Sequence, residues 1–421
     1  MAQFTDTLGT NLLKLLYPDG VDELLFKGAP AFAWVPKSTG GGGKGHQLNW
    51  IIDGLSSSST FATALANMTY GTFPTPLVTY ADVYCLGSIS NKAMALSEGD
   101  KKAVKGLLKT QTDQAMYTIR RKLAREIWGD RSGNLGRVST ATAPSTTTIT
   151  LNSVWDVPNF EKNMFIVGSD VATGASIHAS PNRAQITAID PGSTSTAATL
   201  TIDVAYTTSM PGLGTSDYLY EEGSVGSAAG IVMDGFLRWI PITAPTAGDA
   251  QYSVDRSVFV TRMAGSRYVG TGPIETRLSN SLSFLNVNGG EPDTIWLHPM
   301  RGAELRENVQ SLTRYGFQWN TSKAVKMDGS EAAIGVQGFK IVGPNGPVEV
   351  LEDRNCPYNY ALVTARDSWL LESAGELPHF DKQSGDRLFV EGLSDGKQFR
   401  LKGYVNLICK EPVHSCIVTL P

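Results

Sequence analysis

The feature that most constrains this chain is a long amphipathic helix, predicted to begin after a cap at Ser97 or Asp100 and to stop at Gly129. Apolar side chains recur there at the spacing of one helix face, and Gly129 is placed to end the helix. About 28 residues at about 1.5 Å each give a rod of roughly 42 Å. The apolar stripe, the strongest helix signal in the sequence, consists of Val104, Leu108, Ala115, Ile119, Leu123 and Ile127.

The opposite face of this helix is basic. One interpretation is a solvated face whose cations form salt bridges with neighbouring acidic groups, and the other is contact with nucleic-acid phosphates. Spacing alone leaves both open. The basic side chains are Lys101, Lys102, Lys105, Lys109, Arg120, Arg121, Lys122 and Arg125.

Residues 1–45, at the start of the chain, are predicted to form an arm. Phe4, Leu8 and Leu12 recur at helical spacing before Pro18 ends the pattern. A short amphipathic helix cannot bury its apolar face alone, so we expect the arm to need a neighbour in the same chain or another.

Residues 46–96 are predicted to form a long β-hairpin. Gln47–Ile51 and Val78–Tyr84 alternate polar and apolar side chains, with the polar tip Ser56–Ser59 between them. An isolated two-stranded ribbon is marginal in water, so a hairpin this long makes sense if it lies across another molecule. We expect Trp50 and Phe61, on its shoulders, to be exposed and to make assembly contacts.

The composition changes at residues 138–224, which are rich in Ser, Thr and Ala. Short β-branched runs separated by turn residues predict a small all-β module inserted between helical segments. The runs are Thr146–Leu151, Met164–Val167, Arg183–Ala188 and Thr199–Val204.

Residues 225–421 mix helices and strands, so the predicted class is α+β. Pro273–Leu285 and Pro299–Leu312 have helical patterns with a proline near the first turn. Phe399, Leu401, Val405 and Leu407 alternate with Arg400, Lys402, Tyr404 and Asn406, which predicts a half-buried strand.

Composition limits the classes of function. Of 421 residues, 41% are hydrophobic and 18% charged, and the net charge of −4 does not favour a sequence-specific DNA-binding protein. No secretory signal or membrane-spanning stretch is apparent, so we expect synthesis in a cytoplasm and no membrane. The four cysteines, Cys85, Cys356, Cys409 and Cys416, are too scattered for a disulfide framework.

Each motif that suggests catalysis or ligand binding lacks a feature that the chemistry requires. Gly392-Leu-Ser394-Asp-Gly396 matches the esterase nucleophile pattern, but an alternating strand follows where a helix is required, which favours a hairpin turn. Gly40–Gly45 lacks the spacing of a phosphate loop and is interpreted as a flexible hinge. Cys409, His414 and Cys416 lack a fourth zinc ligand. We therefore expect no enzyme, metal or cofactor, and an esterase using Ser394 is a remote alternative.

The order of arm, hairpin, long helix, β module and mixed domain resembles the Hong Kong 97-type major capsid proteins of tailed bacteriophages. The resemblance spans nearly the whole chain. The strings that carry it are Ser59–Ala64 with Asn67, Tyr84–Ile89, Arg131–Gly136, Gly375–Pro378 and Arg400–Asn406.

The resemblance implies a domain organisation. Residues 1–45 would be the N-terminal arm, 46–96 an extended loop that laps a neighbouring subunit, and 97–137 the spine helix of a peripheral domain. Residues 138–224 would be an inserted β domain, and 225–421 the rest of the peripheral domain together with an axial domain.

The resemblance also implies a function. Subunits would assemble as pentamers and hexamers into an icosahedral head shell that encloses double-stranded DNA, formed in the host bacterial cytoplasm and retained in the virion. A separate scaffolding protein and a portal are implied partners, and no small-molecule substrate is implied. Packaged DNA would be contacted non-specifically through an interior basic face of Lys101, Lys105, Lys109, Arg120, Arg121 and Arg125. The same fold serves bacterial encapsulin nanocompartments, which are the alternative.

Overall fold

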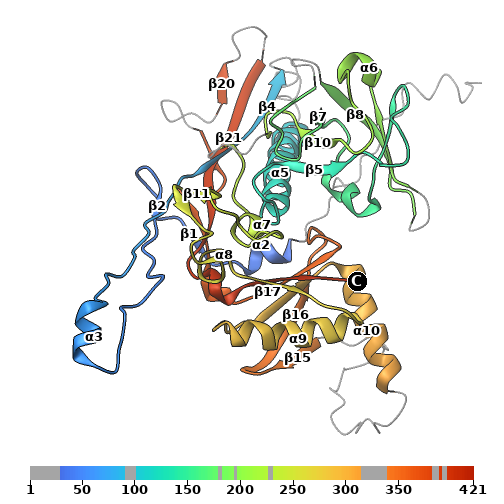
Figure 1. Ribbon diagram of the computed structural model, residues 1–421. Coiled ribbons are helices and arrows are strands. Elements are labelled where there is room, and N and C mark those ends of the chain that lie inside the picture. The colour runs from blue at the N-terminus through green and yellow to red at the C-terminus, as the bar shows by residue number, and fades with distance from the viewer. Residues whose placement is uncertain are drawn as a thin grey trace, which may run out of the picture.

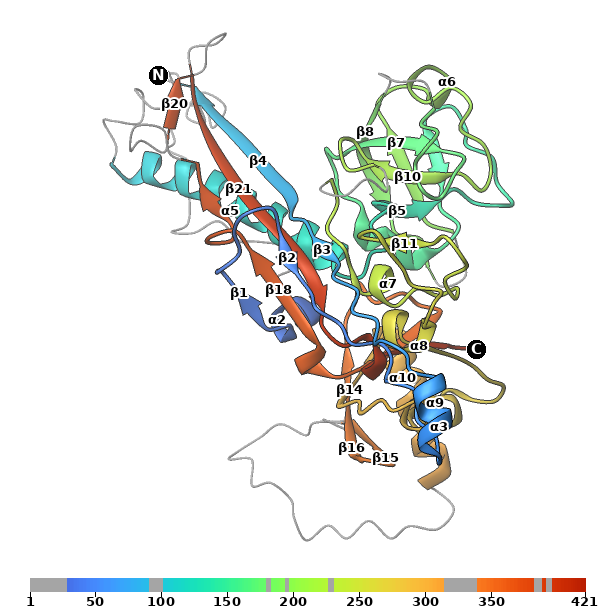
Figure 2. The same ribbon diagram turned by 60° about the vertical axis from the view of Figure 1, so that its left-hand side comes forward.

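A computed structural model describes residues 29–90, 101–178, 183–193, 197–225, 231–313, 339–381, 388–390 and 396–421. The helices predicted within residues 1–28 and the turn around Ser394 lie outside these residues. The described chain forms one sheet along a long helix, a second sheet beyond the end of that helix, a third sheet beside the helix, and a loop that projects to one side (Figures 1 and 2).

The long helix is α5, Lys101–Glu126, which confirms the predicted rod. Ala115, Ile119 and Leu123 are buried along one face, and Ile127 is buried directly after the helix. The Gly129 N–H donates to the Glu126 carbonyl at 2.8 Å and closes the end of the helix. The side chains of residues 101–110 lie outside the part that the structure describes.

The first sheet packs against α5. Its main pair is β4 (Ala81–Ser90) and β21 (Gly396–Cys409), which are antiparallel from Ala81 opposite Val405 to Ser90 opposite Gly396. Figure 2 shows both strands running along α5. The other strands are β1 (Lys37–Ser38), β18 (Trp369–Ser373), β19 (His379–Phe380) and β20 (Leu388–Val390).

The alternation predicted for β21 is confirmed from Phe399 to Val405, but Asn406 is buried, not exposed. Its amide nitrogen donates to the Thr79 carbonyl at 2.6 Å, and its oxygen accepts the Asp234 N–H at 2.8 Å. Tyr252 donates its hydroxyl proton to the Asp234 carboxylate. These bonds tie β21 to segments distant in sequence, which explains how a polar side chain is accommodated in the core.

The second sheet has the strand order β13 (Ser266–Val269), β22 (Cys416–Thr419), β17 (Tyr360–Thr364), β14 (Thr294–Leu297), β16 (Gly346–Glu352) and β15 (Phe339–Gly343). One face is covered by α9 (Ile274–Val287), through Ile274, Leu278 and Leu282. From the other face, Trp296 and Leu362 join the core around α5. Helix α10 (Pro299–Thr313) lies beside α9, so both predicted helices are confirmed.

The third sheet lies within residues 134–221 and has its own apolar core of Ile149, Ile166, Ile186 and Leu219 among others. All four predicted β-branched runs contain strands of this sheet. The strand β5 precedes the predicted boundary at residue 138. The order is β5 (Asn134–Arg137), β10 (Tyr218–Glu221), β7 (Phe165–Ser169), β8 (Ala184–Asp190), β9 (Thr199–Ile202) and β6 (Thr148–Thr150).

Short elements connect the sheets. The helices are α2 (Pro30–Trp34), α6 (Tyr206–Ser209), α7 (Phe236–Trp239) and α8 (Val260–Ala264), with 3-10 turns at Val154–Asn159, Arg366–Ser368 and Pro412–His414. A two-stranded ribbon consists of β11 (Ala250–Gln251) and β12 (Val254–Asp255).

The projecting loop differs in part from the predicted hairpin. Its strands β2 (His46–Gln47) and β3 (Leu77–Val78) pair, but the residues from Ala81 onward pair with β21 instead. Beyond the polar run Ser56–Ser59 lies a helix, α3 (Phe61–Ala66), which the sequence pattern did not predict. The Thr60 hydroxyl caps this helix by accepting the Thr63 N–H at 3.3 Å.

Two glycines of the segment at residues 40–45, Gly41 and Gly45, are closely packed, and the interpretation of this segment as a flexible hinge stays a prediction. The Gly41 N–H donates to the Ser373 carbonyl at 3.1 Å. A Cβ on Gly45, whose φ is +147°, would lie 2.2 Å from the Val78 carbonyl oxygen. These positions need glycine because backbone from other strands approaches them.

A charge on the buried stripe of α5 should prevent folding. We expect Ile119→Asp to lower the free energy of unfolding by about 4 kcal/mol or more, because it buries an unpaired carboxylate. The matched control is Thr118→Asp, one residue away at an exposed position. Urea unfolding followed by circular dichroism measures both, and equal stability of the two variants would contradict the burial of this stripe.

A second prediction concerns His298, which precedes α10. Its Nδ1 accepts the Met300 N–H at 3.3 Å, and its ring packs edge-on against the stacked rings of Trp155 and Tyr358. Burial, followed by the nearby Arg301 guanidinium, lowers the pKa of His298 to about 4. In the unfolded chain a histidine has a pKa of about 6.5, so between these values only the unfolded state takes up the proton.

The contribution of neutral His298 to the free energy of unfolding is therefore fully present above about pH 6.5 and is lost as the pH falls toward 4. We expect His298→Gln to flatten the dependence of unfolding free energy on pH in this window. Urea unfolding from pH 4.5 to 8 tests this. The difference between the two proteins should be constant above pH 7, and parallel profiles below pH 6.5 would refute the assignment.

Candidate assembly surfaces

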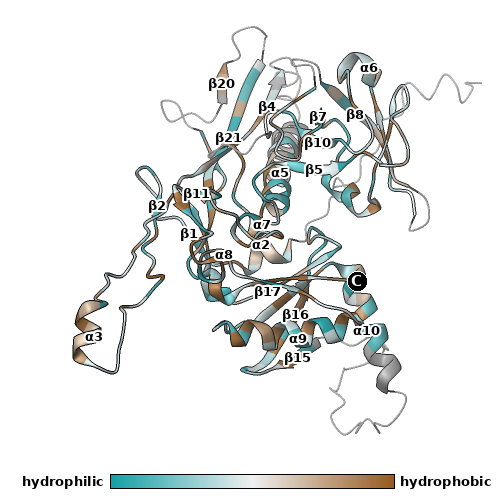
Figure 3. Cartoon of the chain, viewed as in Figure 1, coloured by the Kyte–Doolittle hydropathy of each residue, from teal (hydrophilic) through white to brown (hydrophobic). Residues whose placement is uncertain are grey.

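The end of the projecting loop exposes large apolar side chains. Phe61 is 83% exposed and Tyr70 is 88% exposed. Figure 3 shows the pale brown of α3 at the far end of this loop, away from the other labelled elements. Several large apolar side chains exposed on one short segment are a candidate interaction site. We call these side chains the apolar tip: Leu55, Phe61, Leu65, Met68, Tyr70 and Phe73.

The two aromatic residues predicted as assembly contacts have different environments. Phe61 is exposed in α3 as expected, and its role in assembly stays a prediction. The expected exposure of Trp50 is wrong, because its ring is half-buried with its centroid 6.2 Å from that of Trp239. Its Nε1–H also donates to the Lys410 carbonyl at 2.8 Å. Trp50 therefore anchors the loop to its own subunit.

The described basic residues of α5 lie mostly against the third sheet. Arg121 Nη1 lies 2.9 Å from Glu161 Oε2, and its Nη2 donates to the Pro158 and Phe160 carbonyls at 2.8 Å. For Arg121 the structure favours the alternative of ion pairs with neighbouring groups. Arg120 is exposed, while the side chains of Lys101, Lys105 and Lys109 lie outside the described part.

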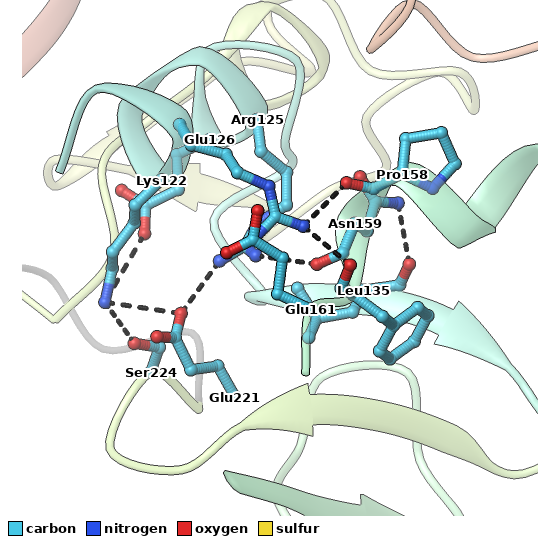
Figure 4. Close-up of polar contacts among 11 residues, drawn as sticks. Lys122, Arg125, Glu126, Leu135, Pro158, Asn159, Glu161, Glu221 and Ser224 are labelled. Carbon is cyan, nitrogen blue, oxygen red and sulfur yellow. Dashed lines mark hydrogen bonds and ion pairs between the residues drawn. The ribbon is translucent and has the colours of Figure 1, made fainter. Parts of the chain in front are cut away.

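Arg125 is engaged in the same way at the junction between α5 and the third sheet (Figure 4). Its Nη2 lies 2.8 Å from Glu221 Oε2, and its Nη1 donates to the Asn159 carbonyl at 3.1 Å. Lys122 Nζ lies 3.6 Å from the same Glu221 oxygen. We call Arg121, Lys122, Arg125, Glu161 and Glu221 the junction network.

Burial and charge act against each other in this network. Burial alone would raise the pKa of Glu221, but Arg125 and Lys122 outweigh it and lower that pKa below its usual value. For Glu126, which is completely buried beside them, burial dominates and raises the pKa. The three cations are thus paired with the two carboxylates Glu161 and Glu221, which holds the third sheet to the helix.

An apolar pocket of about 700 Å³ opens at the edge of this junction. Trp155, Val157, Phe160 and Ile189 supply its apolar walls, and Arg121 and His298 also line it. Among the described lining residues the carboxylate is Glu161, which is paired with Arg121, and the hydroxyl is Ser193.

The remaining candidate side chains are occupied in other ways. Burial raises the pKa of the Cys409 and Cys416 thiols, and His414 accepts the Glu291 N–H at 3.0 Å. Within the described ranges no three His, Cys, Asp or Glu side chains are grouped to hold a metal ion. In the same ranges no helix is long and apolar enough to cross a membrane. Ser394 is outside them.

No protein-family model matches the sequence, and no curated protein matches it as a relative. A solved structure of the cyanophage A-1(L) capsid asymmetric unit matches the fold with a TM-score of 0.58 at 12% identity, covering 99% of each chain. The holo-SrpI encapsulin complex from Synechococcus elongatus has a TM-score of 0.46 at 8% identity, covering 99% of this chain and 96% of the other.

The capsid of the native GTA particle also has a TM-score of 0.46 at 8% identity, covering 98% of this chain and 96% of the other. At 12% identity, the likeness to the cyanophage capsid establishes a common fold over almost the full length of both chains. The chain therefore has the Hong Kong 97-like fold of phage capsid subunits, as its sequence predicted.

Proposed function

We propose that this chain is the major capsid protein of a tailed bacteriophage, which assembles as pentamers and hexamers into an icosahedral shell around double-stranded DNA. The observation that supports this most is the apolar tip, carried on a projecting loop of a subunit with a capsid fold. In a protein that stayed monomeric, these side chains would remain exposed to water at the end of the projecting loop.

Burial of the apolar tip against a second copy supplies the energy of assembly. Apolar surface contributes about 25 cal/mol per Å² removed from water, so a few large side chains give several kcal/mol per contact. The contact is heterologous, because the tip of one copy meets a different surface on the next, and such contacts can close into rings. Each subunit makes many contacts at once in a shell, so each can be modest.

The partners follow from the same proposal. Arg120, with Lys101, Lys105 and Lys109, is the remaining candidate for a basic face toward packaged DNA, since Arg121 and Arg125 are held in the junction network. A scaffolding protein and a portal are proposed partners during assembly in the host bacterial cytoplasm, and the virion is the final location. No catalytic role is proposed for the subunit.

An encapsulin-type compartment is the second candidate, since a shell fold does not identify the contents. Electron microscopy of particles isolated from the native host separates the two. Large shells that contain DNA support the phage capsid, and small shells that contain an enzyme support the encapsulin. A protein that stays monomeric at all concentrations would contradict both.

We also infer that residues 134–221 form an inserted β domain. This inference is supported by two observations: the region has a complete sheet and a separate apolar core, and it is held to α5 by polar contacts of the junction network. The first and last strands in sequence, β5 and β10, are neighbours in that sheet, so the two ends of the region lie close together. Closely spaced ends are common where one domain is inserted into another.

An excised fragment tests this inference. We expect residues 131–225 to fold with β-type circular dichroism and a cooperative thermal transition. A fragment of residues 139–225 is the matched comparison, because it lacks β5 and leaves β10 with an uncovered edge. We expect it to melt at a lower temperature. A featureless coil spectrum from the longer fragment would contradict an independent domain.

The apolar tip gives the test of assembly. We expect Phe61→Ser with Leu65→Ser to leave a folded subunit, because both side chains are exposed, but to reduce the yield of shells at least about tenfold. Ala62→Ser with Ala66→Ser is the control, since it adds two hydroxyls to the same helix and removes little apolar surface. Shells are counted by electron microscopy and folding is checked by thermal melting. Normal shell yield from the Phe61/Leu65 variant would exclude the tip as an assembly contact.

A further inference from the structure

The base of the projecting loop is packed on its own subunit, unlike the tip. Leu48 and Val78 are buried in the core around α5, and Ile52 is 4% exposed. Ile51 is exposed, and from Gly54 onward most residues of the loop are exposed. Just before Gly54, the Asp53 carboxylate accepts the Thr72 hydroxyl at 2.8 Å. We call residues 46–52 and 72–78 the stem.

Beyond the paired strands β2 and β3, the hydrogen bonds between the two halves of the stem run in one direction. Leu48 donates its N–H to the Pro76 carbonyl at 2.9 Å, and Trp50 donates to the Pro74 carbonyl at 3.1 Å. In an ordinary antiparallel ribbon the facing residue would return a bond, but proline has no N–H to donate. Pro74 and Pro76 therefore remove half of the expected bonds at these two positions.

The third position of the stem is completed by the body of the subunit. Ile52 donates its N–H to the Thr72 carbonyl at 3.5 Å, whereas the Thr72 N–H is directed to the Asp53 carboxylate. The Ile52 carbonyl accepts instead from Arg262 Nη1, on α8. The guanidinium of Arg262 also lies 4.5 Å from the centre of the Phe259 ring, which helps to hold its direction.

Trp50 provides a second link between the stem and the body. Its indole N–H reaches the Lys410 carbonyl just after β21, and its ring meets Trp239 edge-on. A ribbon that lacks returning bonds bends easily on its own. Its direction must therefore come from contacts with the rest of the subunit, and Arg262 and Trp50 make those contacts from two sides.

We propose that Arg262 and Trp50 form a latch that sets the direction in which the loop leaves the subunit. The proposal rests on the proposed function, in which the apolar tip must reach a second copy in one orientation. Arg262 is a positioning residue, since it contacts the stem and not the tip. Without it the subunit folds and keeps its apolar tip, but the tip is presented over a range of directions.

The direction of the loop can be measured in unassembled subunits. Spin labels on Ala66→Cys in the tip and Ser283→Cys on exposed α9, in a Cys85→Ser background, report the distance between loop and body by pulsed electron resonance. We expect a narrow distribution with Arg262 and a broader, displaced one in Arg262→Gln. Arg262→Lys keeps a cationic donor and should restore most of the narrow distribution.

Two further variants separate the latch from general effects. Arg183→Gln removes an exposed arginine that pairs with Glu222 in the third sheet, and it should leave the distances unchanged. Trp50→Phe keeps an aromatic ring and removes the donor to Lys410, so it should broaden the distribution. Thermal melting confirms that each variant is folded, and an unchanged distribution in folded Arg262→Gln overturns the latch.

Electron microscopy of assembled particles links the latch to assembly. We expect Arg262→Gln to give shells of mixed size and shape, in contrast to the low yield expected when the apolar tip is removed. Uniform shells of wild-type size from Arg262→Gln would also overturn the proposal. If the wild-type protein forms no shells, the proposed function fails, while the distance measurement still tests the latch by itself.

Discussion

The packing of α5 against the sheet of β4 and β21 is the interaction on which the rest of the structure depends. Ile119 and Leu123 place an apolar ridge along that sheet, and Ile127 carries it past the end of the helix. Just beyond, Trp128 meets Trp296 of the second sheet with ring centres 6.0 Å apart. One continuous core therefore joins helix and two sheets, and it fixes where the third sheet and the loop are attached.

The outer parts of the subunit are attached to this core by different chemistry. The third sheet is held by charged groups of the junction network, in which Glu221 pairs with both Arg125 and Lys122. The loop leaves from an apolar and aromatic base around Leu48 and Trp50 and ends in exposed apolar side chains. The charges of the junction network are therefore paired within the chain, whereas the apolar side chains at the end of the loop remain exposed.

Local patterns identified the elements well because they report which face of a segment is buried. The period of α5, the prolines that begin α9 and α10, and the alternation from Phe399 to Val405 all follow from side-chain direction along one helix or strand. For the same reason the β-branched runs located strands of the third sheet. The order of these elements also carried the resemblance to a capsid fold, which the structure bears out.

The sequence by itself therefore determined the three long helices α5, α9 and α10, the strands of its clearest alternating and β-branched runs, and the fold to which their order belongs. Tertiary structure alone decided which side chains are covered within the chain and which remain exposed. Ala81–Ser90 pairs with a strand more than 300 residues away, Asn406 is satisfied in the core, Arg121 turns to a carboxylate, and Trp50 is covered by Trp239. The physical reason is that periodicity describes how a side chain points from its own segment. The partner that covers it comes from a distant part of the chain, so its burial depends on the packing of the whole subunit.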